Sequence, residues 1–157
     1  MQALNAPAAR QGSFHRVSPG SSPATVPVPP CAELVLIRGL PGSGKSTMAQ
    51  VLAQVGYDHF EADMFFMRAG KYCYDKMRIR DAHAWCKRQT QEALATGNRV
   101  VVSNTFTRLN EMDEYLAMTR NVRILEARGR WQNSHGVPQE TLAAMANRWE
   151  PIPAAAH

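Results

Sequence analysis

The clearest chemical signature in the sequence is an eight-residue run rich in glycine. It reads Gly39-Leu40-Pro41-Gly42-Ser43-Gly44-Lys45-Ser46 and satisfies the pattern G-x-x-x-x-G-K-[ST] in full. Its glycines allow the backbone to wrap closely around a phosphate and to aim N–H groups at it. Lys45 is expected to reach the β- and γ-phosphates, Ser46 to ligate Mg²⁺, and Thr47 to support the loop. The run therefore predicts a P-loop that binds a nucleoside triphosphate, ATP, together with magnesium.

The segments on either side of this run have the patterns that a P-loop requires. Residues 34–37 form a short continuous apolar run of the kind found in buried parallel strands. A helical pattern follows from about Lys45 to Val55. The phosphate-binding residues then lie at a helix N-terminus, where the helix dipole favours anions. Because motif and context agree, a chance match in a glycine-rich turn is a poor explanation.

The rest of the chain alternates between strand and helix patterns. Further strands are predicted at residues 57–62, 100–102 and 122–125, and further helices at 75–96, at 110–118 and from Pro138 onward. In the last helix, Leu142, Met145 and Trp149 have the spacing of a core-facing stripe. Such alternation is typical of a mostly parallel sheet with helices on both faces. We therefore expect an α/β fold of three layers, with four or five strands.

Asp63 follows the second predicted strand, at the sheet edge where ligands gather in open α/β folds. Its carboxylate is a candidate general base that accepts the proton of an attacking hydroxyl. An aspartate is equally suited to cap a helical segment that starts at Met64. Position alone does not decide between these two interpretations.

Three polar residues, Ser103, Asn104 and Thr105, follow the third predicted strand at the same edge. A carboxylate that organises magnesium is often expected there, and this chain has Ser103 instead. Asn104 and Thr105 are candidates to hold phosphate oxygens or metal-bound water. The alternative is that they cap the strand and form a turn.

Basic residues are grouped at two further places. On the long helix, Arg80, His83 and Lys87 lie on one flank of the apolar stripe and form a candidate wall for a phosphorylated acceptor. The alternatives are a solvated helix face and, for His83, a buried hydrogen-bonded ring. After the fourth strand, Arg128 and Arg130 are candidates to stabilise the transferring phosphoryl group, or are solvated loop charges.

Two irregular segments contain further candidates. Tyr72 and Tyr74, before the long helix, either stack on a base or pack against the core. Residues 133–138 have the glycine and proline punctuation of a functional loop, and His135 within it is a candidate substrate-binding residue.

The charge, the cysteine count and the apolar runs of the chain limit the kinds of ligand and partner that it is expected to bind. The chain has 18 basic and 13 acidic residues, and two of the basic ones lie in the acid-free residues 1–30. The remainder, with 16 basic against 13 acidic residues, suits a phosphate-bearing ligand but not a strong duplex binder. Three cysteines argue against a disulfide framework and favour a reducing cytoplasm. No apolar run approaches the ~20 residues that span a bilayer, so no membrane partner is expected.

From residue 34 to 150 the chain resembles the small AAA-family ATP-binding proteins of bacteria, a branch of the polynucleotide-kinase-like and zeta-toxin-like P-loop kinases. The resemblance depends on five motifs. They are residues 38–47, Glu61-Ala62-Asp63, Asp81-Ala82-His83, residues 102–107 and His135-Gly136-Val137-Pro138.

This resemblance implies a kinase-type P-loop NTPase with its P-loop strand central, ATP as donor and Asp63 as the base. The family's arginine three residues after the base is absent, because position 66 is Phe66, unless Arg68 substitutes for it. The acceptor stays open between a nucleic-acid 5′ end, a nucleotide and a small metabolite. An ATPase and a nucleotide-binding module without turnover are the rival functions, and the oligomeric state is not predicted.

Residues 1–30, rich in Ala, Ser, Gly and Pro, are expected to be a disordered leader before a domain at 31–157. A transit peptide is the less favoured alternative. Because the leader offers no periodic apolar face, deleting it should leave the melting temperature nearly unchanged. A large fall in the melting temperature of the truncated protein would show that these residues pack on the domain.

Overall fold

A four-stranded parallel sheet lies at the centre of the computed structural model, which describes residues 31–132 and 136–154. Its strands are Leu34–Arg38 (β1), Tyr57–Phe60 (β2), Arg99–Asn104 (β5) and Val122–Glu126 (β6), in the order β2-β5-β1-β6. The predicted parallel sheet is confirmed, with the P-loop strand inside it. Residues 1–30 and His135 lie outside the described residues.

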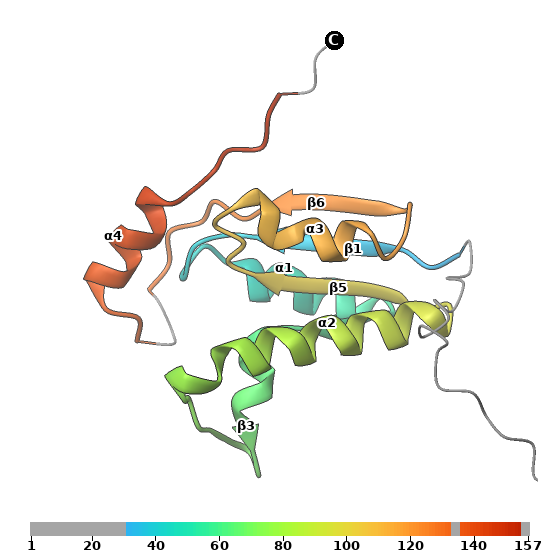
Figure 1. Ribbon diagram of the computed structural model, residues 1–157, viewed down its shortest axis with the longest axis horizontal. Coiled ribbons are helices and arrows are strands. Elements are labelled where there is room, and N and C mark those ends of the chain that lie inside the picture. Colours follow the sequence, from blue (N-terminus) through green and yellow to red (C-terminus); the bar gives the residue numbers. More distant parts are fainter. Residues whose placement is uncertain (1–30, 133–135, 155–157) are drawn as a thin grey trace, which may run out of the picture.

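Helices cover both faces of the sheet, so the three predicted layers are present (Figure 1). One face packs against α1 (Lys45–Gln54), and the other packs against α2 (Ile79–Ala95) and α3 (Asp113–Leu116). Side chains of β1 alternate between these layers. Leu34 and Leu36 belong to the cluster with α2 and α3, whereas Val35 and Ile37 pack with Ala49 of α1. Apolar burial on both faces explains why β1 is a continuous hydrophobic run.

The long helix begins with a capped turn. The Asp75 side chain accepts a hydrogen bond from the Met77 N–H, and a 3-10 turn at Lys76–Arg78 leads into α2. Its buried stripe is Ala82, Cys86, Thr90 and Leu94, and Gly97 follows the helix end with a φ of 86°. The predicted helix at 75–96 therefore contains both elements. In place of the predicted helix at 110–118 there is a 3-10 turn at Leu109–Met112 followed by α3.

A small hairpin between β2 and α2 was not predicted. After a 3-10 turn at Ala62–Phe66, the two-residue strands β3 (Met67–Arg68) and β4 (Lys71–Tyr72) pair antiparallel. Ala69 and Gly70 connect them with φ angles of 47° and 76°. Strands of two residues are too short to show an alternating pattern in the sequence. Figure 1 shows β3 below the N-terminal half of α2.

The last helix, α4 (Gln139–Asn147), corrects the prediction of a core-facing stripe. None of its residues is buried, and Leu142 and Met145 are half-buried. Trp149 lies beyond the helix end and packs under a guanidinium instead. Figure 1 shows α4 beyond the carboxyl edge of the sheet, away from the three layers. Periodicity indicated the inward side of this helix but not how much of it would be covered.

Arg38 ends β1 and is fully buried. Its Nε and Nη2 donate to the carbonyl of Phe106 at 3.1 and 2.8 Å, and Nη2 also donates to Thr107 O at 3.2 Å. Its Cζ lies 3.9 Å from the ring centroid of Trp149. Phe106 has a φ of 44°, a conformation unfavourable for an aromatic residue, so these bonds hold a strained loop in place.

Within the described residues, no helix combines the length and the apolar character needed to cross a membrane.

Replacing Arg38 tests its support of the loop after β5. A buried carbonyl left without a donor costs about 1–3 kcal/mol. Arg38→Met removes the donor from two carbonyls, so we expect the unfolding free energy to fall by about 2–4 kcal/mol in urea denaturation. Arg99→Met is the matched control, because Arg99 also bonds a carbonyl and stacks on a ring, but on the surface. An equal loss in both variants would contradict the proposed support.

Candidate active site

The P-loop runs from Gly39 into the first turn of α1, at the carboxyl edge of the sheet. It is fastened on both sides: the Gly39 N–H donates to Thr105 O, and the Gly129 and Trp131 N–H groups donate to Ser43 O and Gly42 O. Helix α1 begins at Lys45 with Gly44 as its N-cap. Backbone N–H groups of a first helical turn have no partner within the helix, so they are available to an anion.

At two positions of the loop, a residue larger than glycine would collide with its neighbours. Gly44 has a φ of 89°, and a Cβ there would lie 2.6 Å from the indole of Trp131. A Cβ on Gly39 would collide with Ser43 Oγ and press against Ala127. Ser43 Oγ is itself buried and has no hydrogen-bond partner among the described residues. A buried hydroxyl without a partner at this position fits a loop that is completed by a bound phosphate.

Lys45 is half-buried and faces two carboxylates. Burial lowers the pKa of Lys45, and the negative charges of Glu61 and Asp63 act in the opposite direction. The acids lie just after β2, and their charges act on the lysine across the carboxyl edge of the sheet. This cluster is the part of the predicted site that the fold brings together.

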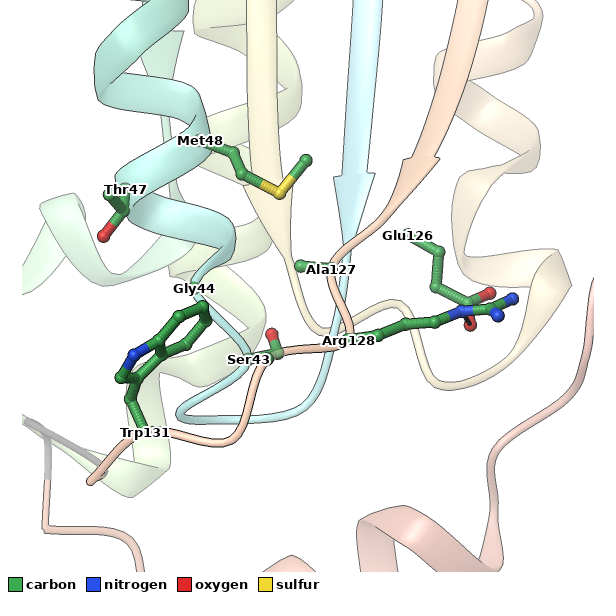
Figure 2. A pocket seen from close by; sticks show the side chains of 9 residues that line it. Ser43, Gly44, Thr47, Met48, Glu126, Ala127, Arg128 and Trp131 are labelled. Carbon is green, nitrogen blue, oxygen red and sulfur yellow. Dashed lines mark hydrogen bonds and ion pairs between the residues drawn. The ribbon is translucent and has the colours of Figure 1, made fainter.

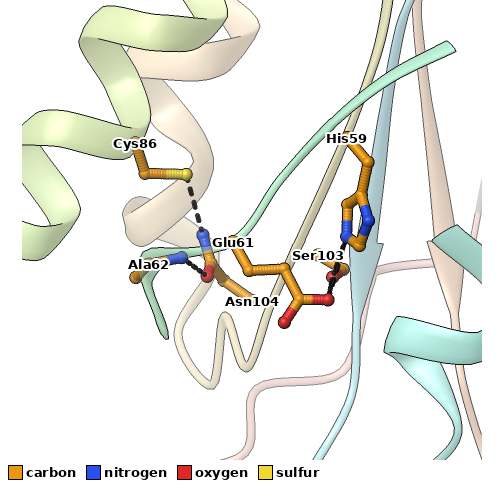
Figure 3. A network of polar contacts seen from close by, with 6 residues as sticks. All are labelled: His59, Glu61, Ala62, Cys86, Ser103 and Asn104. Carbon is orange, nitrogen blue, oxygen red and sulfur yellow. Dashed lines mark hydrogen bonds and ion pairs between the residues drawn. The ribbon is translucent and has the colours of Figure 1, made fainter. Parts of the chain in front are cut away.

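Glu61 is a buried site residue to which the sequence analysis assigned no role. Its Oε1 accepts a hydrogen bond of 2.7 Å from Ser103 Oγ and lies 2.9 Å from His59 Nε2 (Figure 3). Burial raises the pKa of Glu61, but hydrogen bonds from His59, Ser103 and Ser46 outweigh it and hold the pKa below its usual value. Glu61 is therefore favoured in its ionised form, and it lies near the P-loop serine. The sequence contained one signal for a role of Glu61: Ser103 follows the third predicted strand at a position where an acid is often expected.

Asn104 was predicted to hold phosphate oxygens or metal-bound water, but its side chain bonds groups inside the protein. It lies within β5, and its Oδ1 accepts a bond of 2.9 Å from the Ala62 N–H. Its Nδ2 lies 3.7 Å from the Cys86 sulfur of α2 (Figure 3). Both ends of the amide are engaged inside the protein, so Asn104 holds the segment that contains Glu61 and Asp63 instead of facing a phosphate. Thr105 lies just after the strand and offers its carbonyl to the P-loop.

Asp63 lies within the 3-10 turn at Ala62–Phe66, whose N-cap is Glu61. It therefore does not cap the segment at Met64, and the capping interpretation is wrong. Its Oδ1 accepts a hydrogen bond of 3.2 Å from the Tyr72 hydroxyl of the hairpin. Partial burial and the Asp63 charge raise the pKa of Tyr72 to about 12, so this hydroxyl is protonated and donates at neutral pH. Asp63 thus already accepts a hydrogen bond from a hydroxyl.

One of the predicted basic residues, His83, lies close enough to this cluster for the charge of Asp63 to act on it. Burial lowers the pKa of His83, whereas the charges of Glu111 and Asp63 act in the opposite direction. Arg80 and Arg130 are exposed, and no contact described for them joins them to the P-loop. Arg128 is 81% exposed and pairs with Glu126 at 2.9 Å. Lys87 pairs with Glu114 of α3 at 2.7 Å, as a structural contact between helices.

A pocket of about 530 Å³ opens beside the P-loop (Figure 2). Its lining is Ser43, Gly44, Thr47, Met48, residues 126–129 and Trp131. The Trp131 indole lies against Gly44 and Gly129 and is 69% exposed, so much of its surface is open to solvent. Figure 2 shows Arg128 directed toward Glu126 and away from Trp131. An open aromatic surface beside a phosphate loop is a platform on which a nucleotide base can stack.

The oxygen donors at this edge are those that magnesium prefers. Ser46 offers a hydroxyl, and Glu61 and Asp63 offer carboxylates. The described residues contain no cluster of three or more His, Cys, Asp or Glu that would hold a metal by itself.

Comparisons with known proteins agree with this geometry. Residues 34–131 match the family described as AAA domain. Over 133 residues the chain is 29% identical to human NEDD4-binding protein 2, an alignment that covers 74% of this chain. The chain spans only 8% of the length of that relative.

Two solved structures share the fold. A gluconokinase from Sinorhizobium meliloti 1021 superposes with a TM-score of 0.56 at 20% identity, covering 76% of this chain and 75% of its own. A chain of the Pnkp1/Rnl/Hen1 complex superposes with a TM-score of 0.52 at 18% identity, covering 72% of this chain and 38% of its own. At these identities the likeness shows the fold alone, which is that of P-loop NTPases.

Proposed function

The chain belongs to the AAA domain family, and on that premise we propose that it is an ATP-dependent phosphotransferase that moves the γ-phosphoryl group to a hydroxyl. The observation that carries the proposal is that Lys45 and Asp63 lie at the same edge of the sheet, near enough for the Asp63 charge, after that of Glu61, to raise the pKa of the lysine. A lysine that neutralises phosphate charge and a carboxylate that accepts a proton are the two groups that such a transfer requires.

The donor side consists of the P-loop and the pocket beside it. Backbone N–H groups of the loop, the Ser43 hydroxyl and Lys45 hold the triphosphate, and the base lies over Trp131. Ser46 would ligate a magnesium ion, which would supply positive charge to the phosphates. Because Trp131 and the P-loop are joined by a backbone hydrogen bond, the base and phosphate sites have a fixed relation.

Asp63 is the proposed base on the acceptor side. Its carboxylate holds the Tyr72 hydroxyl at 3.2 Å, so the site has room for a hydroxyl at hydrogen-bonding distance from the base. An acceptor hydroxyl takes this place when Tyr72 gives way. Asp63 then accepts the acceptor's proton as the oxygen attacks the γ-phosphorus, and ADP leaves with the bridging oxygen.

The surface beside Asp63 favours a nucleic-acid end among the three acceptor classes. Tyr72 and Tyr74 stack at 20° with a centroid distance of 6.3 Å, and they are 42% and 54% exposed. Arg68 and Lys71 of the same hairpin are also exposed. Aromatic rings beside basic side chains are the usual platform for a single strand, because they stack on bases and attract phosphates. A small metabolite would need a more enclosed site.

Arg128 and Arg130 are the proposed source of positive charge for the transferring group. Arg128 lines the donor pocket, but its guanidinium is paired with Glu126 and would have to exchange that partner for a phosphate. This requirement gives some weight to the second candidate function, an ATPase or a nucleotide-binding module. Incubation with labelled ATP and a panel of acceptors separates these functions: label appears in an acceptor, as free phosphate, or in neither.

The Lys45→Ala variant tests the donor site. Charged hydrogen bonds contribute about 1.5–3 kcal/mol, so we expect ATP to bind about 10–100-fold more weakly, measured by calorimetry. The far-ultraviolet dichroism should be unchanged, because Lys45 faces the site and not the core. A variant that bound and turned over ATP like the parent would contradict the P-loop assignment.

The Asp63→Asn variant tests the base and separates a kinase from a binder. The amide keeps size and most hydrogen bonds but cannot take a proton, so transfer to an oligonucleotide 5′-hydroxyl should fall about 10²–10⁴-fold. ATP affinity and melting temperature should stay near the parental values. Asp58→Asn is the control, because Asp58 bonds Asn98 at the other end of β2. Transfer that persists within a factor of a few would make Asp63 a structural residue, with His83 the next candidate.

A further inference from the structure

The strand beside the P-loop strand lacks the acid that P-loop phosphotransferases commonly have. In such enzymes the P-loop hydroxyl shares magnesium with an aspartate of a second conserved motif. Here β5 ends in Ser103 and Asn104, and the amide of Asn104 is already engaged with Ala62 and Cys86. The end of β5 therefore offers no carboxylate to the ion.

A carboxylate that follows the next strand reaches the same place. Glu61 directly follows β2, which pairs with β5. The Ser103 hydroxyl, which stands where an acid is expected, donates to Glu61 Oε1 at 2.7 Å. His59 Nε2 lies 2.9 Å from the same oxygen, and neither contact uses Oε2. Figure 3 shows the second carboxylate oxygen directed away from both partners.

We infer that Glu61 is the carboxylate that positions Ser46 and the magnesium ion of a bound nucleotide, in the place that β5 leaves without an acid. The inference rests on the proposed binding of ATP with magnesium and names the residue that orients the ion. Ser46 contributes to the lowered pKa of Glu61, and the Glu61 charge raises the pKa of Lys45, so the carboxylate lies near both P-loop side chains. Its bond with Ser103 places it at the end of β5, directly beside the P-loop strand.

A purely structural role for Glu61, in which it only holds β2 against β5, explains less of its hydrogen-bond geometry. Burying a carboxylate costs several kcal/mol unless it is paired and hydrogen-bonded. His59 and Ser103 offset that cost through Oε1 alone. They fix the direction of the group while the carboxylate still lies near Ser46, as is typical of residues that orient a metal ligand.

The test measures affinity for a non-hydrolysable ATP analogue with saturating Mg²⁺ and with EDTA, so it requires neither an acceptor nor turnover. For the nearly isosteric Glu61→Gln variant, we expect the gain in affinity that Mg²⁺ provides to fall about 10–100-fold, as for other groups that orient metal ligands. The affinity in EDTA should stay close to the parental value or rise, because a negative charge near the phosphates is removed.

Glu33→Gln is the matched control. The Glu33 side chain is 16% exposed against 12% for Glu61, and it bonds Tyr57 and Arg123 just before the start of β1. We expect it to leave both affinities unchanged. A loss of magnesium dependence in both variants would reflect general loosening of the fold and would overturn the inference.

Two variants of Ser103 extend the test, the first where Glu61→Gln folds and the second where it does not. Ser103→Asp in the Glu61→Gln background returns an acid to the end of β5 and should restore much of the magnesium dependence. Ser103→Ala keeps the Glu61 charge but removes one of its two supports, so a smaller loss is expected. Parental magnesium dependence in Glu61→Gln, or in Ser103→Ala where the first variant is unfolded, contradicts the inference.

The experiments distinguish failure of the inference about Glu61 from failure of the proposed phosphotransferase function. If the parent binds the analogue with a magnesium dependence that needs Glu61 but transfers no label to any acceptor, the phosphotransferase proposal fails and the role of Glu61 stands. If transfer occurs and Glu61→Gln keeps the parental magnesium dependence, the phosphotransferase stands and the role of Glu61 is wrong.

Discussion

Parallel pairing of β1 with β5 brings the ends of both strands to one edge of the sheet, where Ile37 pairs with Ser103 and Arg38 with Asn104. This register places Ser103 and Asn104 where they bond Glu61 and Ala62, and so it positions the acidic segment of the site. Ser103 belongs to the face covered by α1 and meets Glu61, while Asn104 belongs to the opposite face and meets Cys86 of α2. A slip of one residue would exchange the two faces and remove both hydrogen bonds that hold the segment after β2, at Glu61 and Ala62. The apolar side chains that fix the layers therefore also fix the site.

The charges at this edge would make the proposed triphosphate binding dependent on a divalent cation. Lys45 and the N-terminal end of α1 are positive, but Glu61 and Asp63 face the same lysine. Bringing phosphates to this place adds negative charge beside two carboxylates, at the half-buried site where solvent screening is reduced. Ser46, Glu61 and Asp63 would hold a magnesium ion here, and its charge would relieve the repulsion between the carboxylates and the phosphates. The same arrangement would disfavour binding of the free nucleotide.

Long-range features of the fold were predictable from the sequence because each has a strong local signal. The P-loop, the buried β1 strand and the alternation that gives the three layers all come from motif and apolar pattern. The hairpin at 67–72 was missed because two-residue strands leave no pattern, and α4 was expected to be more buried than it is. Glu61 was named as part of a motif but received no role, because its partners, Ser103 and Ser46, come from distant parts of the chain.

Burial and hydrogen bonding distinguish the polar residues that stabilise this edge of the sheet from those that are available to a ligand. Arg38 and Asn104 are buried, and their bonds go to neighbouring loops, so they shape the edge from inside. Ser43 is also buried, yet its hydroxyl has no partner among the described residues, and Glu61 uses only Oε1 on His59 and Ser103. An unbonded buried oxygen costs free energy unless a ligand completes it. Arg38 Nη1 is also buried without a partner among the described residues, so the lack of a partner does not by itself mark a ligand site. Ser43 Oγ differs because it lies within the P-loop, where a bound phosphate would complete its hydrogen bonds.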